Sequence, residues 1–143
     1  MANGIYKITE DFEKALADYT GAPYVVTVDN QSNALFLALM YEDVKGMDIT
    51  IPSRTYPSVP CEIIHAGATV NFKPVKGKTI KGAYQLEPTN VWDSALSFTY
   101  NMYKPGTHMC ISFTGPYKHF KLSKGGAILT DNHDAYLWFK RAR

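Results

Sequence analysis

The fold class is decided by residues 48–75, DITIPSRTYPSVPCEIIHAGATVNFKPV. The segment opens with a short β-branched strand that stops at Pro52, and Pro57 is well placed in the first turn of a helix that ends at Gly67. A second strand follows at residues 69–75. Because short connections join the strand, the helix and the next strand, this segment predicts an α/β unit with parallel strands.

The same alternation of helix and strand extends on both sides of this unit. Apolar spacing predicts helices at residues 8–19, 32–42 and 131–143. It predicts strands at residues 24–28, 109–113 and 126–130, and a further strand that ends at residues 91–93. A weak strand is expected at residues 82–86, between turns at residues 76–82 and 87–90. The helix at 32–42 is apolar on nearly every side, which indicates burial on more than one face. We therefore predict a single α/β domain over residues 1–143, with a three-layer, mostly parallel sheet flanked by helices.

Composition and charge narrow the possible functions. The chain has 143 residues, enough for one domain with a core, and a net charge of +2, which is too small to indicate binding to nucleic acid or to an anionic membrane. Cys61 and Cys110 form no disulfide framework and indicate a reduced, intracellular protein. The chain starts without the apolar core of a signal peptide, and no apolar run approaches a membrane span. We therefore expect a cytoplasmic protein that binds neither nucleic acid nor membrane.

Polar and reactive residues gather in four segments at the ends of predicted strands, where open α/β sheets place their ligands. The first segment is DNQSN, residues 29–33, between a strand and a buried helix. The first N–H groups of that helix and its dipole favour an anion, and Ser32 adds a hydroxyl. A simple helix cap formed by Asn30 or Ser32 explains the same residues.

Two further segments each contain one notable side chain. In SRTYP, residues 53–57, Tyr56 either stacks on a flat ligand ring or packs near the edge of the sheet. In VWDSA, residues 91–95, Asp93 ends an apolar strand. A carboxylate in that position needs a cationic or hydrogen-bonding partner, because burying it alone is costly. Alternatively, Asp93 caps the turn that follows.

The fourth segment is CISFTGPYK, residues 110–118, followed by HFKLSKGGAILT. Lys118 lies in a loop between two predicted strands, where a lysine can form an imine with an aldehyde. A basic loop that contains Lys118, Lys121 and Lys124 and is simply solvated explains this segment as well. No metal site is expected from any of the four segments.

Taken in this order, the segments resemble the DegT/StrS-type sugar aminotransferases, a family of fold type I enzymes that depend on pyridoxal 5′-phosphate (PLP). Residues 55–75 look like the family's aromatic-bearing helix, its AGA turn and the strand after it. Residues 12–39 look like its opening helix, strand and phosphate-binding helix, and CISF, a lysine and GGAILT look like its Schiff-base segment. The resemblance implies a reduced version of the fold type I large domain.

The resemblance also implies roles for individual residues. Lys118 would hold PLP as an internal aldimine, and Asp93 would pair with the pyridine nitrogen and strengthen the electron-sink character of the cofactor. Tyr56 would stack on the ring. Gln31 and Ser32 would hold the phosphate at the helix N-terminus, and Ser112 would add a hydroxyl. Asn30 is also expected among the cofactor-binding residues.

The chain departs from the family pattern in several places. It is less than half the usual length and lacks the small C-terminal domain, and residues 69–93 compress a strand–helix unit. Gln31-Ser32 replaces Gly-Thr in the phosphate loop, and Leu96 replaces a Gln or His near the ring hydroxyl. The loop at residues 112–118 is one residue longer.

The function that the resemblance implies is a minimal PLP-dependent aminotransferase. An amino acid such as glutamate would convert PLP to pyridoxamine phosphate (PMP), and a keto acceptor, by family resemblance a keto-sugar nucleotide, would receive the amino group. The site would be shared across a homodimer. Two alternatives stay open, namely a non-catalytic PLP-binding or assembly module derived from the family, and a fragment of a full-length enzyme.

Overall fold

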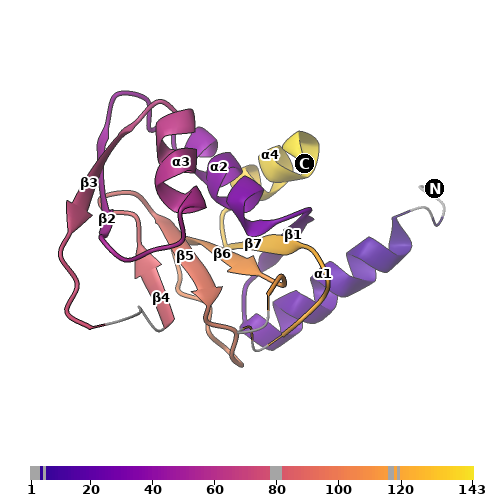
Figure 1. Cartoon of the computed structure of the whole chain (residues 1–143). Coiled ribbons are helices and arrows are strands. Elements are labelled where there is room, and N and C mark those ends of the chain that lie inside the picture. The colour runs from indigo at the N-terminus through magenta and orange to yellow at the C-terminus, as the bar shows by residue number, and fades with distance from the viewer. Residues whose placement is uncertain (1–3, 5, 78–81, 116–117, 119) are drawn as a thin grey trace.

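The computed structural model describes residue 4 and residues 6–77, 82–115, 118 and 120–143. Within them the helices are α1 (Lys7–Thr20), α2 (Gln31–Tyr41), α3 (Ser58–His65) and α4 (His133–Ala142), and the strands are β1 (Tyr24–Val28), β2 (Asp48–Pro52), β3 (Thr69–Lys73), β4 (Gly82–Gln85), β5 (Val91–Leu96), β6 (His108–Ser112) and β7 (Gly126–Thr130). Figure 1 shows these elements along the chain.

The strands form a five-stranded sheet in the order β1-β7-β6-β5-β4 and a two-stranded sheet of β2 and β3. Among the described residues, one isolated antiparallel bridge joins β2 to the connection between β4 and β5, where Thr50 and Glu87 exchange backbone hydrogen bonds of 2.8 and 3.1 Å. Of the strand pairs that the described residues form, β5–β6 and β2–β3 are parallel, and the other three are antiparallel.

The α/β class is thus confirmed, but the predicted mostly parallel pairing is wrong, and the sheet is mixed. The physical reason lies in the connections. A parallel neighbour needs a crossover of about a dozen residues, normally a helix. The connection from β4 to β5 covers only residues 86–90, and β7 follows β6 without a helix among the described residues, so both pairs reverse direction.

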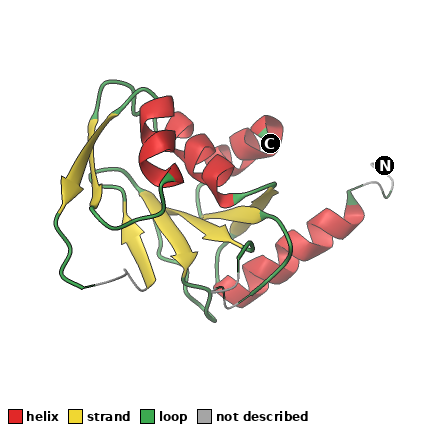
Figure 2. Cartoon of the chain, viewed as in Figure 1, coloured by secondary structure: helices red, strands yellow, loops and turns green. Residues whose placement is uncertain are grey.

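Helices cover both faces of the larger sheet, which gives the three layers predicted (Figures 1 and 2). On one face, Leu16 of α1 joins a buried cluster with Met109 and Ile111 of β6. On the other face, α2, α3 and α4 enclose a second cluster, in which Leu35 packs with Cys110. Alternate residues of β6 therefore face opposite clusters, as expected for a strand covered on both sides.

Most predicted elements agree with the structure to within two residues at each end. The prediction of a helix buried on more than one face is confirmed, because α2 contacts α3, α4 and the sheet. Asp93, predicted at the end of a strand, lies inside β5, because β4 continues to pair with β5 as far as Leu96. The predicted turn at residues 76–82 falls partly on residues 78–81, outside the described part of the chain.

The cysteines and the helix lengths bear on the predictions made from composition. Cys61 and Cys110 are both free, Cys61 at the surface and Cys110 in the core. No helix among the described residues combines the length and the apolar character that crossing a membrane requires.

Candidate cofactor site

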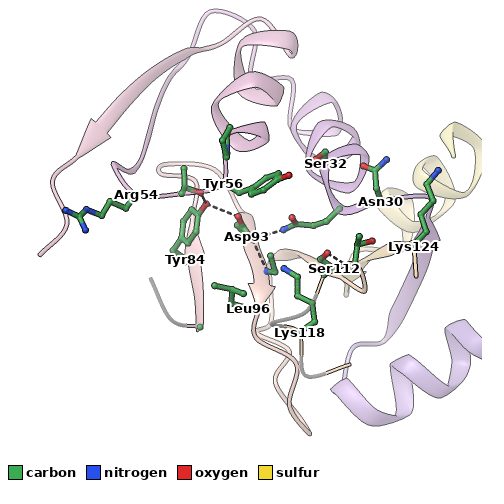
Figure 3. Close-up of a pocket in the computed structure, with 17 residues that line it drawn as sticks. Asn30, Ser32, Arg54, Tyr56, Tyr84, Asp93, Leu96, Ser112, Lys118 and Lys124 are labelled. Carbon is green, nitrogen blue, oxygen red and sulfur yellow. Dashed lines mark hydrogen bonds between the residues drawn. The ribbon is translucent and has the colours of Figure 1, made fainter. Parts of the chain in front are cut away.

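A cavity of about 860 Å³ opens where β1, β2, β5 and β6 lead into their following segments. This volume lies within the range of about 300–1,000 Å³ that is typical of small-molecule sites. The seven side chains predicted for the site all line this cavity, namely Asn30, Gln31, Ser32, Tyr56, Asp93, Ser112 and Lys118. Figure 3 shows how they converge from separate segments of the chain.

Asp93 is the most constrained polar group in the cavity. Its side chain is buried, with the residue 5% exposed, and it accepts three hydrogen bonds from protein groups. Gln31 Nε2 and the Ala95 backbone N–H donate to Oδ1 at 2.6 and 2.9 Å, and the Tyr84 hydroxyl donates to Oδ2 at 2.8 Å. These donors supply the partners that a buried carboxylate requires.

Gln31 contributes to the site through two different groups. Its side-chain amide nitrogen donates to Asp93 and also to the backbone carbonyl oxygen of Cys110, at 3.2 Å. A side-chain amide has two N–H donors, so these contacts occupy both. The side chain of Gln31 therefore faces the acid, and Gln31 contributes to the start of α2 through its backbone.

The N-terminus of α2 forms another wall of the cavity. Asn30 caps this helix, because its side-chain oxygen accepts from the Asn33 N–H at 2.8 Å. The Ser32 hydroxyl donates to the Ser58 hydroxyl at 2.8 Å, which links the first turn of α2 to the first turn of α3. The N–H groups in the first turn of a helix, together with its dipole, favour a bound anion.

Gly126 of β7 allows α2 to begin this close to the sheet. A Cβ atom at this position would lie 2.8 Å from the Gln31 nitrogen, 2.8 Å from the Ile111 oxygen and 2.9 Å from the Asn30 carbonyl carbon. These are backbone atoms, which cannot move aside as a flexible side chain can. Glycine is therefore required here for the close approach of two backbones.

Lys118 enters the cavity from the loop between β6 and β7, and its side chain extends toward Asp93 (Figure 3). Burial lowers the pKa of the Lys118 amine, and the nearby Asp93 charge opposes that effect without cancelling it. A lowered pKa increases the fraction of free amine at neutral pH, which is what a nucleophilic lysine requires.

An aromatic cluster anchors the loop that carries Lys118. The Phe120 ring lies 5.4 Å from the rings of both Phe98 and Phe113 and 6.2 Å from that of Phe12 on α1. The backbone closes the loop through a hydrogen bond of 2.9 Å from the Leu122 N–H to the Phe113 oxygen. Lys118 thus lies two positions before Phe120, whose ring packs against the sheet and α1.

The remaining predicted residues lie at the rim and the wall. Tyr56 is 73% exposed, and its ring is among the side chains that line the cavity (Figure 3). Ser112, at the end of β6, accepts a hydrogen bond from the Thr114 N–H at 3.3 Å. Leu96 also lines the cavity and gives its wall an apolar side chain.

Tyr84 is a cavity residue that the sequence reasoning missed. It stands opposite Asp93 in the antiparallel β4–β5 pair, and burial together with the Asp93 charge raises its pKa far above the ordinary range. A signal was present, because the short EPTN turn between two predicted strands indicates a hairpin, and hairpin pairing places these side chains on one face.

The described residues contain no group of three or more His, Cys, Asp or Glu side chains that could hold a metal ion. The ionisable side chains that line the cavity are instead one acid, Asp93, two lysines, one arginine and two tyrosines. Fold and site thus define an α/β domain with an enclosed acid, a partly buried lysine and a helix N-terminus around one cavity.

Comparison with known proteins assigns this domain to a family. The model of the DegT/DnrJ/EryC1/StrS aminotransferase family matches residues 3–91, and the chain belongs to that family. A dTDP-3-amino-3,6-dideoxy-α-D-galactopyranose transaminase from Aneurinibacillus thermoaerophilus is 32% identical over 91 residues, which are 63% of this chain and 24% of that protein. The resemblance inferred from the sequence segments is therefore confirmed.

Solved structures show the same fold. A protein from Bacillus cereus described as a PLP-dependent aminotransferase superposes with a TM-score of 0.77 at 21% identity, over 95% of this chain and 49% of that one. A GDP-4-keto-6-deoxymannose-3-dehydratase with a trapped PLP–glutamate geminal diamine superposes with a TM-score of 0.71 at 19% identity, over 96% and 47%. The chain thus spans about half the length of these structures.

Proposed function

We propose that this chain binds PLP in the cavity and supports the transfer of an amino group from an amino acid to a keto acceptor. The observation that carries the proposal is the position of the Lys118 amine and the Asp93 carboxylate in one cavity that also contains the N-terminus of α2. An aldehyde, a ring nitrogen and a phosphate are the three polar ends of PLP, and each has a chemically matched group here.

The residues present fit this cofactor. A carboxylate offers about four acceptor positions, and the protein donors occupy three of those on Asp93, which leaves one on Oδ2 for a ring N–H. Asn30, Gln31 and Ser32 place the start of α2 at the anionic end, where Ser112 adds a hydroxyl. The exposed ring of Tyr56 provides a stacking surface.

When bound, PLP supplies an electron sink that makes the bonds around the donor nitrogen easier to break. The residues of the chain do the rest. Lys118 would hold the cofactor through Nζ, and its free amine, whose pKa burial lowers, would serve as the general base that carries a proton. Asp93 would favour the protonated form of the ring nitrogen through its negative charge.

The identity of the substrates and partners is also part of the proposal. We infer that glutamate or a similar amino acid is the donor, with PMP as the intermediate form, and that a keto-sugar nucleotide is the acceptor, since a relative of the chain is a transaminase for a dTDP-linked amino sugar. We further infer a homodimer, because Tyr56 and Leu96 leave apolar surface at the mouth of the cavity. A cytoplasmic location stays a prediction.

One alternative function has specific support. Leu96 places an aliphatic side chain in the wall of the cavity, which cannot hydrogen-bond a cofactor hydroxyl. A module that binds PLP without turnover would show this feature. Adding glutamate discriminates the two functions, since a transaminase loses the visible absorption of bound PLP and the module retains it.

The test of the proposal uses the purified protein and PLP. We expect a visible absorption band, and we expect borohydride to fix a pyridoxyl group on Lys118, identified by mass spectrometry of peptides. Lys118→Ala should abolish the band and the label, whereas Lys121→Ala, which removes an exposed lysine of the same loop, should leave both. A Lys118→Ala protein that kept the band would refute the assignment.

A further inference from the structure

We propose that Tyr84 is a positioning residue that sets the orientation of the Asp93 carboxylate and ties it to the segment that carries Tyr56. This inference rests on the proposed function, because it concerns how the chain presents Asp93 to PLP. It goes beyond that function by assigning a role to a residue of the short β4–β5 hairpin.

The hairpin brings Tyr84 into contact with the acid. Tyr84 and Asp93 are register partners in the antiparallel β4–β5 pair, next to an irregularity between Gly82 and Tyr84. Cross-strand partners have side chains on the same face of a sheet, about 5 Å apart at Cβ. The phenol hydroxyl therefore reaches Asp93 Oδ2 at 2.8 Å inside the cavity.

The direction of each hydrogen bond follows from the number of protons. A tyrosine has one O–H, and Tyr84 gives it to Asp93, which accepts from all its other partners as well. Tyr84 is also hydrogen-bonded to the Thr55 hydroxyl, so Thr55 must be the donor in that contact. The result is a directed chain from Thr55 through Tyr84 to Asp93.

This chain connects separate parts of the site. Thr55 immediately precedes Tyr56 in the segment after β2, whereas Asp93 lies in β5 of the larger sheet. Gln31 and the Ala95 N–H hold Oδ1, so the Tyr84 hydroxyl is the protein donor that holds Oδ2. By fixing both oxygens, these donors leave a single direction in which Oδ2 can accept a ring N–H. Tyr84 thus acts on the site through the orientation of the Asp93 carboxylate.

The experiment compares Tyr84→Phe with a matched control, Tyr103→Phe. Tyr103 also donates its hydroxyl within the protein, to the Thr107 oxygen at 2.9 Å, but it lies outside the cavity lining. We expect Tyr84→Phe to raise the dissociation constant for PLP about tenfold, in line with one hydrogen bond to a charged group. We also expect the pH midpoint of the bound cofactor's visible absorption to shift by no more than about one unit, because one pKa unit is equivalent to a tenfold change in an equilibrium constant. Tyr103→Phe should change neither quantity.

Repeating the Tyr84 substitution in a protein that lacks the Asp93 charge separates a positioning role of Tyr84 from direct contact of Tyr84 with PLP. In an Asp93→Asn protein, Tyr84→Phe should change the dissociation constant less than about twofold, because coupled residues lose their separate effects. Thr55→Val should weaken binding in the same direction as Tyr84→Phe but by less. Urea unfolding of each variant without PLP checks that all are folded.

The outcomes separate the inference from the proposed function. If wild-type protein takes up PLP and Tyr84→Phe binds it equally well, the positioning role is refuted while the proposed function stands. If Tyr84→Phe weakens binding tenfold in the Asp93→Asn background too, Tyr84 acts independently of Asp93 and the inference is again refuted. If wild-type protein takes up no PLP, the proposed function fails and the inference fails with it.

Discussion

Gly126 and Gln31 approach each other so closely that a Cβ atom on Gly126 would lie 2.8 Å from the Gln31 backbone nitrogen. This contact joins the start of β7 to the start of α2. It therefore sets the position of the helix N-terminus at one end of the cavity relative to the sheet that carries Asp93.

Gly126→Ala should accordingly damage both stability and ligand binding. The added methyl group must push α2 away from the sheet, and overpacking of this kind costs about 1–3 kcal/mol. We expect a lower urea midpoint of unfolding and a higher dissociation constant for PLP. Gly106→Ala is the control, since a Cβ there meets nothing within 4 Å. Its backbone strain should lower stability without changing PLP affinity.

Phe120→Ala should loosen the loop of Lys118. The ring packs on Phe98 and Phe113 and is partly exposed, so we expect a loss of about 2 kcal/mol, below the ~3–5 kcal/mol typical of a buried phenylalanine. Borohydride labelling of Lys118 at limiting PLP should fall several-fold. Phe72→Ala, which removes a ring that is 56% exposed on β3, should leave labelling unchanged. Equal labelling in the two variants would show that the aromatic cluster does not position the loop.

The reactivity of Lys118 should have a distinctive pH dependence. Burial lowers its pKa, so its free amine should form at lower pH than that of an exposed lysine. In competitive labelling with a small amine reagent followed by mass spectrometry, the midpoint of the pH–rate profile for Lys118 should lie below that for Lys121. Midpoints rather than rates are compared because access to a partly buried amine also slows labelling. Coincident midpoints would contradict the prediction.

Glu13 should make the stability of the fold pH-dependent. Burial opposes its ionisation, but hydrogen bonds from Thr27 and Lys140 and the charge of Arg143 prevail, and they lower the pKa of Glu13 below 4.5. Its contribution to stability is therefore complete above about pH 5 and is lost as the pH falls through the lowered pKa.

The measurement for Glu13 is a comparison of urea midpoints between wild-type protein and Glu13→Gln across pH. The gap between the two proteins should be constant near neutral pH and should close in acid. Asp18→Asn, which alters an exposed residue paired with Lys14 on the same helix, should show little gap at any pH. A gap that persists unchanged down to pH 3 would rule out ionisation of Glu13 as its source.

Local patterns in the sequence predicted the elements well because the forces that decide them are local. The β-branched run of β1 and the glycine that stops α1 at Gly21, where φ is 78°, are legible in the sequence. The pairing of strands was not, because it depends on which connections reverse direction. The short β4–β5 turn was predicted from the sequence, but the antiparallel pairing that so short a turn requires was not.

The candidate site shows the same division. The segments that line the cavity were identifiable from the ends of predicted strands, and they do meet in space. The partners of Asp93 were not identifiable, because Gln31 lies 62 positions away and its side-chain direction is set by packing. Tyr84 was missed for a related reason, since only the hairpin register brings it opposite the acid.

The bridge between Thr50 and Glu87 has a consequence for how such a site can diversify. In the described part of the chain it is the one isolated backbone bridge, and it joins β2 of the smaller sheet to the β4–β5 connection of the larger one. Tyr56 follows the smaller sheet and Asp93 belongs to the larger one, so the aromatic cover and the acid rest on separately hydrogen-bonded frameworks. Substitutions in β2 or β3 would therefore displace the segment of Tyr56 without altering the backbone pairing of β5, and their effect on Asp93 would pass through the side chains of Thr55 and Tyr84.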